Sequence, residues 1–370
     1  MSRNQYPDIR TINQGNSSIT RFSTKSPLFV CVISYTDTST IPGITAAGAN
    51  RDFVKYTPAA DAEFLYYGFC KCIDKVPITP DGNPTPAIIT RAAIGLADIP
   101  FLVVDAGSKI KPSIPYVSFG IDPGHNIESG VAVESIDVRK AFEYGRILGR
   151  QLGKSCDLMV LGESIPGGTT TTLGVLHALG IDAKYKVSSS MQTNPHRLKN
   201  TIVKRSIQKS RISFGELKNN PLEAIAFLGD PMMPSVAGIS EGALSVGGKV
   251  LLAGGTQMAA VLAILKSLGL KMNEVCIGTT IYVANDNSSN LAGLVSSIST
   301  DVPAFAADLR MAKSPIRGLE AFARGFVKDG VGAGGTSIAA MLKSEGRING
   351  DILLKAIEEE YECILHGKSP

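Results

Sequence analysis

The sequence has few histidines and cysteines, and they form no recognised metal-binding motif. Its four histidines are far apart and form neither an HxxxH nor an HxE pattern, and its six cysteines are scattered along 370 residues. Cys70 and Cys72 are separated by one residue, whereas common zinc and redox pairs are separated by two. We therefore expect no bound metal, no cofactor, and free thiols of a reducing compartment.

The chain also lacks a long hydrophobic run. The longest one, residues 250–265, is broken by Gly-Gly-Thr-Gln and is too short to cross a bilayer. The first ten residues, MSRNQYPDIR, contain no apolar signal core. These absences predict a soluble, cytoplasmic protein without a membrane partner.

The glycine turn at residues 162–172 matches neither of two common nucleotide-binding motifs. It is not GxxxxGK[ST], which argues against a P-loop kinase or ATPase, and it is not GxGxxG, which argues against the common dinucleotide-binding fold at this turn. The net charge is only +4. The basic residues of segment 196–211 are spread around a predicted helix with no aromatic residues between them, so we expect a solvated helix surface and no nucleic-acid partner.

The residues that are present predict an α/β protein. Short apolar runs alternate with helical segments, which is typical of a mostly parallel, Rossmann-like sheet flanked by helices. A chain of this length favours one large domain, expected at 27–309, and a smaller, mainly helical lobe formed by 1–26 and 310–370. The expected strands are 28–34, 64–70, 101–105, 158–161, 224–228, 249–253, 275–278 and 302–306, and the main expected helices are 84–96, 137–152, 194–210 and 256–268.

The most informative stretch is residues 156–180, CDLMVLGESIPGGTTTTLGVLHALG. It predicts a strand, a tight turn and the start of a helix. Exposed backbone N–H groups and the helix dipole at such a junction favour an anion, usually a phosphate. The candidate ligands for it are Gly167, Gly168, Thr169 and Thr170.

Similar glycine and threonine turns follow other predicted strands. Because the carboxyl ends of parallel strands line one crevice, several such turns together suit a phosphate and a ribose. Short strand-to-helix connections also favour Gly and Thr for structural reasons alone, which is the alternative interpretation. The further candidates are Gly229, Asp230, Gly254, Gly255, Thr256, Gly278 and Thr279.

Two carboxylates lie next to these turns. Asp329 precedes closely spaced glycines and a predicted helix, and Glu163 precedes the first glycine turn. A carboxylate in an apolar crevice has a raised pKa and can act as a general base. The alternative for Asp329 is a helix-terminal charge that complements the dipole, and for Glu163 a structural or surface carboxylate.

Four segments resemble a known enzyme family. DLMVLGESIPGGTTTT resembles the GEMGIGNTT signature of the nicotinate-nucleotide–dimethylbenzimidazole phosphoribosyltransferases, and KDGVGAGGTSIAA resembles the family's L-G-E-G-S-G-A segment. PTPAIITR and VLLAGGTQMAAVLAIL resemble two further segments less specifically. The similarity runs in order over residues 84–340 and is strongest to the divergent archaeal and cyanobacterial branch.

This resemblance implies a reaction. The family moves ribose 5-phosphate from nicotinate mononucleotide to an aromatic base such as 5,6-dimethylbenzimidazole, giving alpha-ribazole phosphate for the cobalamin lower ligand, and it needs no metal. It implies a homodimer, Asp329 as the base and Glu163 as a carboxylate near the ribose. The glycine and threonine turns would hold the phosphate, and the implied base pocket contains Pro86, Thr90 and Arg91.

The sequence departs from the family pattern at three places. Asp329 stands where the family has glutamate, the first glycine turn reads I-P-G-G, and Arg91 replaces a glutamine. The acceptor base is therefore open, with adenine, a phenol or another azole as alternatives. A catalytically inactive, nucleotide-binding regulatory or assembly protein is the alternative function. A hydrolase would need an activated water, for which the sequence offers no His/Asp or metal arrangement.

Overall fold

A computed structural model describes residues 5–13, 18–48, 50–74, 76 and 82–366. Within this part of the chain, eight strands form one sheet in the order β1-β8-β7-β6-β5-β2-β3-β4. The strands are β1 (Ile9–Thr11), β2 (Pro27–Ile33), β3 (Phe101–Asp105), β4 (Val117–Ser118), β5 (Leu158–Ser164), β6 (Lys249–Ala253), β7 (Val275–Thr280) and β8 (Ala304–Ala307).

The sheet is wound in two directions from its centre. The chain runs from β2 outward to β3 and β4, and then returns to β5 on the other side of β2 and continues to β6, β7 and β8. All these neighbours are parallel, and only β1 is antiparallel, at the edge beside β8. The predicted Rossmann-like α/β fold is therefore confirmed, and the switch in winding direction lies between β2 and β5.

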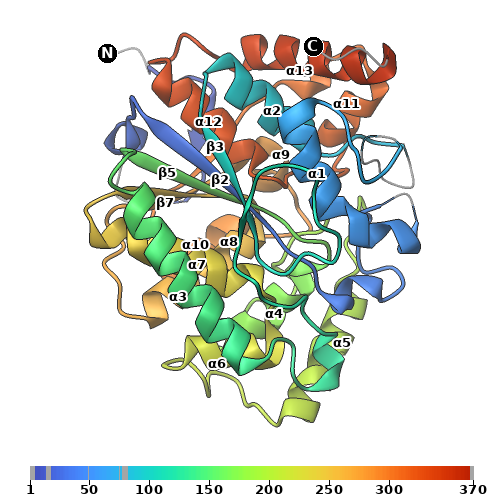
Figure 1. The fold of residues 1–370 in the computed structure, drawn as a ribbon, viewed down its shortest axis with the longest axis vertical. Helices are drawn as coiled ribbons and strands as arrows, with labels where there is room; N and C mark the ends of the chain where they lie inside the picture. Colours follow the sequence, from blue (N-terminus) through green and yellow to red (C-terminus); the bar gives the residue numbers. More distant parts are fainter. Residues whose placement is uncertain (1–4, 14–17, 49, 75, 77–81, 367–370) are drawn as a thin grey trace.

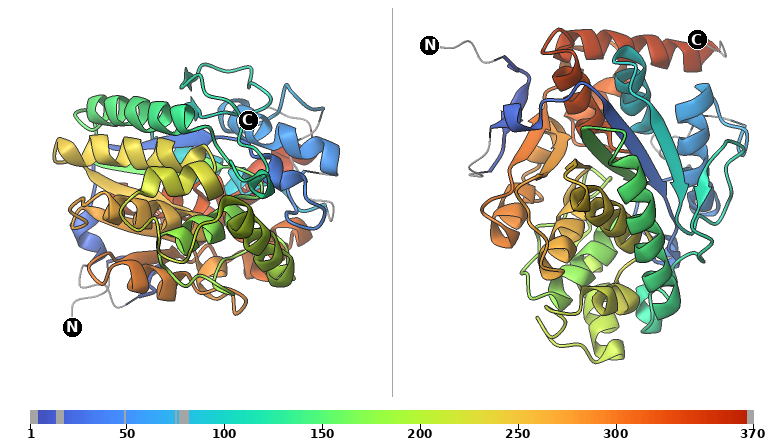
Figure 2. Two further views of the ribbon diagram at one scale, coloured as in Figure 1. Left: turned by 90° about the horizontal axis from the view of Figure 1, so that it is seen from below. Right: turned by 60° about the vertical axis from the view of Figure 1, so that its left-hand side comes forward.

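Helices cover both faces of the sheet (Figures 1 and 2). One layer contains α3, α4, α5, α6, α7, α8 and α10, and the other contains α1, α2, α11, α12 and α13. The helices are α1 (Thr57–Tyr67), α2 (Ala87–Leu96), α3 (Ser135–Leu152), α4 (Gly168–Ala178), α5 (His196–Ser210), α6 (Pro221–Leu228), α7 (Met232–Ser245), α8 (Thr256–Ser267), α9 (Ile281–Ala284), α10 (Leu291–Ile298), α11 (Arg317–Ala323), α12 (Ala333–Lys343) and α13 (Gly350–His366).

Successive side chains of a strand pack against opposite helical layers. Phe29 and Cys31 of β2 pack against the α2/α12 layer, whereas Val30 and Val32 pack against the α7/α8 layer. This alternation follows from the two-residue period of a strand. Both faces are buried, so the strands read as continuous apolar runs. In the described part of the chain no helix is both long and apolar enough to cross a membrane.

Two predicted strands are wrong. Residues 64–70 belong to the end of α1 and the turn after it, and residues 224–228 form the second half of α6. Each helix opens with a proline in its first turn, and α1 ends at Gly68 in the left-handed conformation. Both helices are buried on nearly all sides, so their apolar runs carry no helical period that would distinguish them from buried strands.

The two segments expected to form a smaller lobe both contact the central sheet. In segment 1–26, β1 pairs with β8. In segment 310–370, α12 packs on β5, β6, β7 and β8, and α13 packs on α2 at the upper edge of Figure 1. Residues 1–4, 14–17 and 367–370 of the expected lobe lie outside the described residues.

Candidate active site

A pocket of about 140 Å³ opens at the carboxyl ends of β2 and β5, where the winding direction changes. Ligands of open α/β sheets bind at this point because the loops after the two strands diverge to opposite faces. The pocket wall combines segments that are distant in sequence. They are 44–48 after β2, the start of α1, residues 85–86 before α2, 163–169 after β5, 188–190, 255–257 and 327–331.

One wall of the pocket is the N-terminus of α4. Gly167 adopts a left-handed φ of 80° that a side chain would strain, and its position against Ser39 also leaves little room for a Cβ atom. Gly168 lies against the amide of Gln257, because a Cβ atom there would come 2.0 Å from Gln257 Nε2. The Nε2 atom is buried and has no hydrogen-bond partner among the described residues. The wall therefore offers N–H donors to an acceptor group, which suits an anion.

The neighbouring wall is a serine loop, residues 188–190, which is held from several sides. Thr256 Oγ1 accepts from Ser188 N at 3.0 Å, and Ser190 Oγ accepts from Ala46 N at 3.2 Å across the pocket. Gly255 is the N-cap of α8, and the Thr256 hydroxyl, a predicted phosphate ligand, binds the serine loop.

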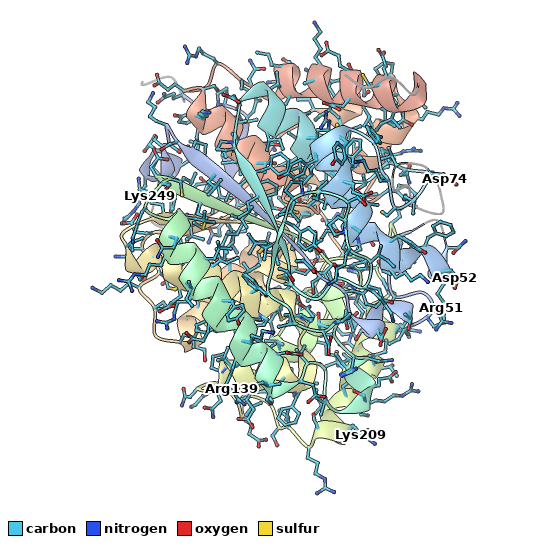
Figure 3. The ribbon with its side chains drawn as sticks, in the orientation of Figure 1. Arg51, Asp52, Asp74, Arg139, Lys209 and Lys249 are labelled. Carbon is cyan, nitrogen blue, oxygen red and sulfur yellow. The ribbon has the colours of Figure 1, made fainter. Side chains whose placement is uncertain are left out.

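Two buried lysines clamp the backbone of this loop. Lys199 Nζ donates to Ser188 O at 2.6 Å, and Lys328 Nζ donates to Ser189 O at 2.9 Å. Lys328 also forms an ion pair of 3.2 Å with Asp286. Burial, with the charge of Lys328 added, lowers the pKa of Lys199 to about 7. Lys199 and Lys328 are buried, whereas the charged residues labelled in Figure 3 lie around the outline of the molecule. These labelled residues are Arg51, Asp52, Asp74, Arg139, Lys209 and Lys249.

A backbone loop under strain, residues 327–331, forms a further part of the pocket wall next to the serine loop. Val327, Lys328 and Val331 have φ values of 60°, 59° and 53°, which non-glycine residues rarely adopt. Such strain persists only where the surroundings hold it, and it concentrates at ligand-binding sites. Here Val327 N donates to Ser190 O and Val331 N donates to Glu163 O, both at 2.9 Å.

Glu163 has one carboxylate oxygen open toward the pocket. Its Oε2 accepts from Ile165 N at 3.0 Å, and its Oε1 accepts no hydrogen bond from any residue that the structure describes. Burial, followed by the nearby charge of Asp230, raises the pKa of Glu163 well above its ordinary value, and the Ile165 N–H opposes this rise. Asp329 and Asp61 add to the increase. The site therefore holds a basic, partly unsatisfied carboxylate.

Asp329 has both of its oxygens occupied. Oδ2 accepts from Thr279 Oγ1 and Thr280 N, both at 2.8 Å, and Oδ1 accepts from Gly330 N at 2.8 Å and Gly334 N at 3.3 Å. Burial raises the pKa of Asp329, and these four donors oppose the rise. The side chain thus joins the end of β7 to the start of α12 while it lines the pocket.

Asp61 is a third pocket carboxylate. It lies on α1, is 2% exposed, and accepts from Thr85 Oγ1 and Ser164 Oγ, both at 2.7 Å. Burial raises its pKa to about 6, although the two hydroxyls lower it. No local sequence pattern indicates Asp61, because its partners lie 24 and 103 residues away along the chain.

The structure brings seven of the predicted site residues to the pocket wall. They are Pro86, Glu163, Gly167, Gly168, Thr169, Gly255 and Asp329. Three others stand directly behind them. Gly254 lies beside the Glu163 carboxylate, Thr256 holds the serine loop and Thr279 binds Asp329.

The other predicted site residues serve the packing of the surrounding elements. Gly229 ends α6, which corrects its expected place after a strand, and Asp230 accepts from the first N–H groups of α7 and from Thr171. Gly278 lies against Gly335 of α12. Thr170 is fully buried in α4, and its hydroxyl is unpartnered among the described residues.

The two polar residues of the predicted base pocket are engaged elsewhere. Thr90 Oγ1 donates to Val331 O at 2.9 Å and is fully buried, so it supports the strained loop from behind. Arg91 forms an ion pair of 2.9 Å with Glu360 and donates to Leu65 O. Neither residue lines the pocket.

Four contributors to the site were missed by the sequence analysis. Gln257 follows the predicted Gly-Gly-Thr turn, so that turn was the available signal for it. Asp61 and Lys328 gave no local signal, and Lys199 was counted with the solvated face of its helix although it is fully buried. Asn194, just before α5, donates its amide to Val187 O and supports the same loop.

The chain is similar in sequence to proteins from several archaea. A protein from Sulfurisphaera tokodaii, named UPF0284 protein, is 44% identical over 91% of this chain and 93% of its own length. A protein of the same name from Methanopyrus kandleri is 40% identical over 96% of this chain and 94% of its own. These names state no activity.

A solved structure shares the fold. It is described as nicotinate-nucleotide-dimethylbenzimidazole phosphoribosyltransferase from Thermus thermophilus, and it matches with a TM-score of 0.62 and 17% identity over 90% of this chain and 83% of the other. A family model described as "Phosphoribosyltransferase" matches residues 91–281, which include β5, α4, β6 and β7. The resemblance found in the sequence is thereby confirmed, and the chain belongs to this phosphoribosyltransferase family.

Proposed function

We propose that the protein transfers ribose 5-phosphate from nicotinate mononucleotide to an aromatic nitrogen base. In the family that the chain resembles, this base is 5,6-dimethylbenzimidazole. The observation that carries the proposal is the open oxygen of Glu163, which faces a pocket with N–H donors on one side and the carboxylate of Asp61 on the other. A single pocket thereby offers both an anion site and a proton acceptor, which this transfer requires.

The donor wall suits the phosphate of the nucleotide. The first N–H groups of α4, from Gly168 and Thr169, are not used within the helix and carry its positive dipole end. Gln257 Nε2 is a further buried donor without a partner in the described residues. A phosphate oxygen at this wall would satisfy the amide, whose burial without a partner is otherwise costly.

Glu163 is proposed as the proton acceptor. One ring nitrogen of the base attacks the anomeric carbon with inversion, and the bond from that carbon to the pyridinium nitrogen breaks. The bonding electron pair stays on the ring nitrogen, which loses its positive charge, and the ring leaves as nicotinate. The proton on the second ring nitrogen of the base passes to Glu163. A raised pKa makes the carboxylate a better base, while the cationic ring of the bound nucleotide favours its ionised form.

Asp329, the base implied by the family resemblance, is proposed as a positioning residue. Its two oxygens already accept four hydrogen bonds from the end of β7 and the start of α12, so it has less capacity to take a proton than Glu163. By holding the strained loop 327–331 in place, it shapes the pocket wall next to Glu163.

A product assay tests the proposal. The protein is incubated with nicotinate mononucleotide and, separately, with 5,6-dimethylbenzimidazole, adenine, a hydroxylated benzimidazole or a phenol, and nicotinate is measured by mass spectrometry. Nicotinate release that depends on a base supports the transferase and identifies the acceptor. Nucleotide binding without release from any base supports the alternative, a nucleotide-binding regulatory or assembly protein.

A further inference from the structure

Asp61 is a buried pocket carboxylate that the proposed reaction does not use. The hydrogen bonds to it from described residues come from two neutral hydroxyls, those of Thr85 and Ser164. A carboxylate has about four acceptor sites, so two remain unfilled. No described cation is paired with it, although burial of an unpaired charge is costly.

A ligand in the pocket is the available source of further donors. Asp61 lines the pocket directly, and the Thr85 and Ser164 hydroxyls fix the orientation of its carboxylate plane. With its pKa at about 6, the group is mostly ionised at neutral pH, and it therefore acts as an acceptor. A buried acceptor of this kind raises the affinity for a ligand that donates an N–H or O–H group and lowers the affinity for one that does not.

The position of Asp61 indicates which part of the reacting pair it faces. Ser164 and Glu163 are successive residues of β5, so their side chains point to opposite faces of the sheet. Asp61, Thr85 and Pro86 belong to the layer of α1 and α2, whereas the donors of α4 belong to the other layer. Phosphate and the nicotinate carboxyl are anions, and the Asp61 carboxylate repels both, so the ribose hydroxyls and the acceptor base are the groups that suit this side. A contact to the ribose would change the KM for nicotinate mononucleotide, whereas a contact to the base would not.

We propose that Asp61 accepts a hydrogen bond from a substituent on the ring of the acceptor base. The preferred acceptor is then an aromatic nitrogen base that carries an amino or hydroxyl group besides the nitrogen pair that reacts. 5,6-Dimethylbenzimidazole is disfavoured, because its methyl groups leave the buried carboxylate without a donor. This inference rests on the proposed transferase reaction, and Asp61 itself moves no proton in it.

The test compares matched bases and matched variants. The kcat/KM values of 5-hydroxybenzimidazole, adenine, benzimidazole and 5,6-dimethylbenzimidazole are measured with the wild type, Asp61→Asn and Asp105→Asn. Asp105 is the control because it is also buried and accepts a serine hydroxyl at 2.7 Å, from Ser108, but lies outside the pocket wall. Unlike Asp61, it is paired with a lysine, Lys111, at 2.5 Å.

The wild type is expected to prefer a base with an amino or hydroxyl substituent by at least about tenfold. In Asp61→Asn this preference disappears through a higher KM for that base, while the KM for nicotinate mononucleotide stays within about twofold. Asp105→Asn keeps the preference. Equal kcat/KM for the hydroxylated and dimethylated bases in the wild type overturns the proposal, as does a preference unchanged in Asp61→Asn.

A binding measurement separates this proposal from the proposed function. If no base releases nicotinate, the transferase function fails, and calorimetry then measures binding of the same bases to the protein saturated with nicotinate mononucleotide. Loss of binding of the hydroxylated base in Asp61→Asn, with binding retained in Asp105→Asn, supports the assignment of Asp61. Equal binding in the wild type and Asp61→Asn overturns it.

Discussion

Glu163 and Asp329 differ in how their carboxylate oxygens are occupied, and the proposed roles of proton acceptor and positioning residue rest on this difference. Glu163 has an open Oε1, whereas Asp329 accepts four hydrogen bonds. Removal of a general base costs about 10²–10⁴ in rate, whereas loss of hydrogen bonds at a buried acceptor costs about 1–3 kcal/mol of stability.

Glu163→Gln is therefore expected to lower kcat by about 10²–10⁴ with little change in melting temperature. Asp329→Asn is expected to lower the unfolding free energy by about 1–3 kcal/mol, because the new amide faces N–H donors. Steady-state kinetics and thermal melts of both variants measure the two effects. If Asp329→Asn loses turnover at unchanged stability while Glu163→Gln stays active, then Asp329, and not Glu163, accepts the proton.

A second prediction at this scale concerns pH. Burial raises the pKa of Asp230 to about 6, against hydrogen bonds from Thr171 and from the N–H groups of Met233 and Met232. In the unfolded chain an aspartate titrates near pH 3.9, so between about pH 4 and pH 6 the folded state binds more protons than the unfolded state. The unfolding free energy contributed by this group therefore falls as pH rises through that window, by up to about 3 kcal/mol.

Urea unfolding of the wild type and Asp230→Asn at pH 4, 5, 6 and 7 tests this sign. Asparagine does not titrate, so the difference in unfolding free energy, wild type minus variant, should fall from pH 4 to pH 6 and then level off. Asp157→Asn provides a reference, because hydrogen bonds to Asp157 leave its pKa lowered. Its contribution to the unfolding free energy rises with pH mainly below about pH 4, so the difference between wild type and Asp157→Asn should stay nearly constant from pH 5 to pH 7. A constant difference across the range for Asp230 would refute the prediction.

At the scale of elements, α3 and α7 pack with their backbones in direct contact. Gly145 and Gly149 of α3 lie against the backbone of α7, and Gly238 and Gly242 of α7 lie against the backbone of α3. A Cβ atom at Gly149 would come 2.1 Å from Ile239 O, which no rotamer change relieves. The glycines therefore set the distance between the two helices.

Gly149→Ala is expected to lower the unfolding free energy by about 1–3 kcal/mol or more, because the helices must separate. Gly95→Ala is the matched control. Gly95 is also inside a helix, α2, but a Cβ atom there meets nothing within 4 Å, so alanine is expected to stabilise by up to about 1 kcal/mol. Chemical denaturation of both variants measures the contrast, and an equal effect in both would exclude backbone contact as the cause.

Elements were predictable from the sequence where their surroundings are uniform. The strands β2, β3, β5 and β6 are buried on both faces and lie between helices with clear boundaries, so their apolar runs identified them. The helices α1 and α6 were missed, because burial on nearly all sides removes the polar stripe that reveals a helical period. The glycine turn at the start of α4 was predicted because its strand, turn and helix are contiguous.

At the scale of the whole molecule, the site depends on contacts that no local pattern contains. Asp61 is fixed by Ser164, 103 residues away, and Lys328 is fixed by Ser189, 139 residues away. Glu163 was found from its neighbouring turn, but its open oxygen and the full occupancy of Asp329 emerge only when β5, β7 and α12 are assembled. The sequence thus indicates the family and the anion-binding turn, while the division of roles among the carboxylates requires the fold.

The pocket joins both helical layers, and this gives a prediction for the whole molecule. Its walls include the start of α4 from one layer and the loop 327–331 that leads into α12 of the other. A ligand bound there contacts both layers and stabilises the native state by about 2.7 kcal/mol at one hundred times its Kd. Hydrogen exchange should therefore slow in segments 167–171 and 327–334 together when nicotinate mononucleotide and a base are added.

The α3 and α7 helices provide the internal reference for that experiment, because their contact lies outside the pocket wall. Local opening of the pocket segments should be suppressed, while the exchange of segment 238–243 changes only through global unfolding. Protection confined to segment 167–171 would mean that the ligand binds the anion wall alone, and the carboxylates of the second layer would then have no part in the reaction. Protection of both segments places the ligand between the two helical layers, at the point where the sheet reverses its winding direction.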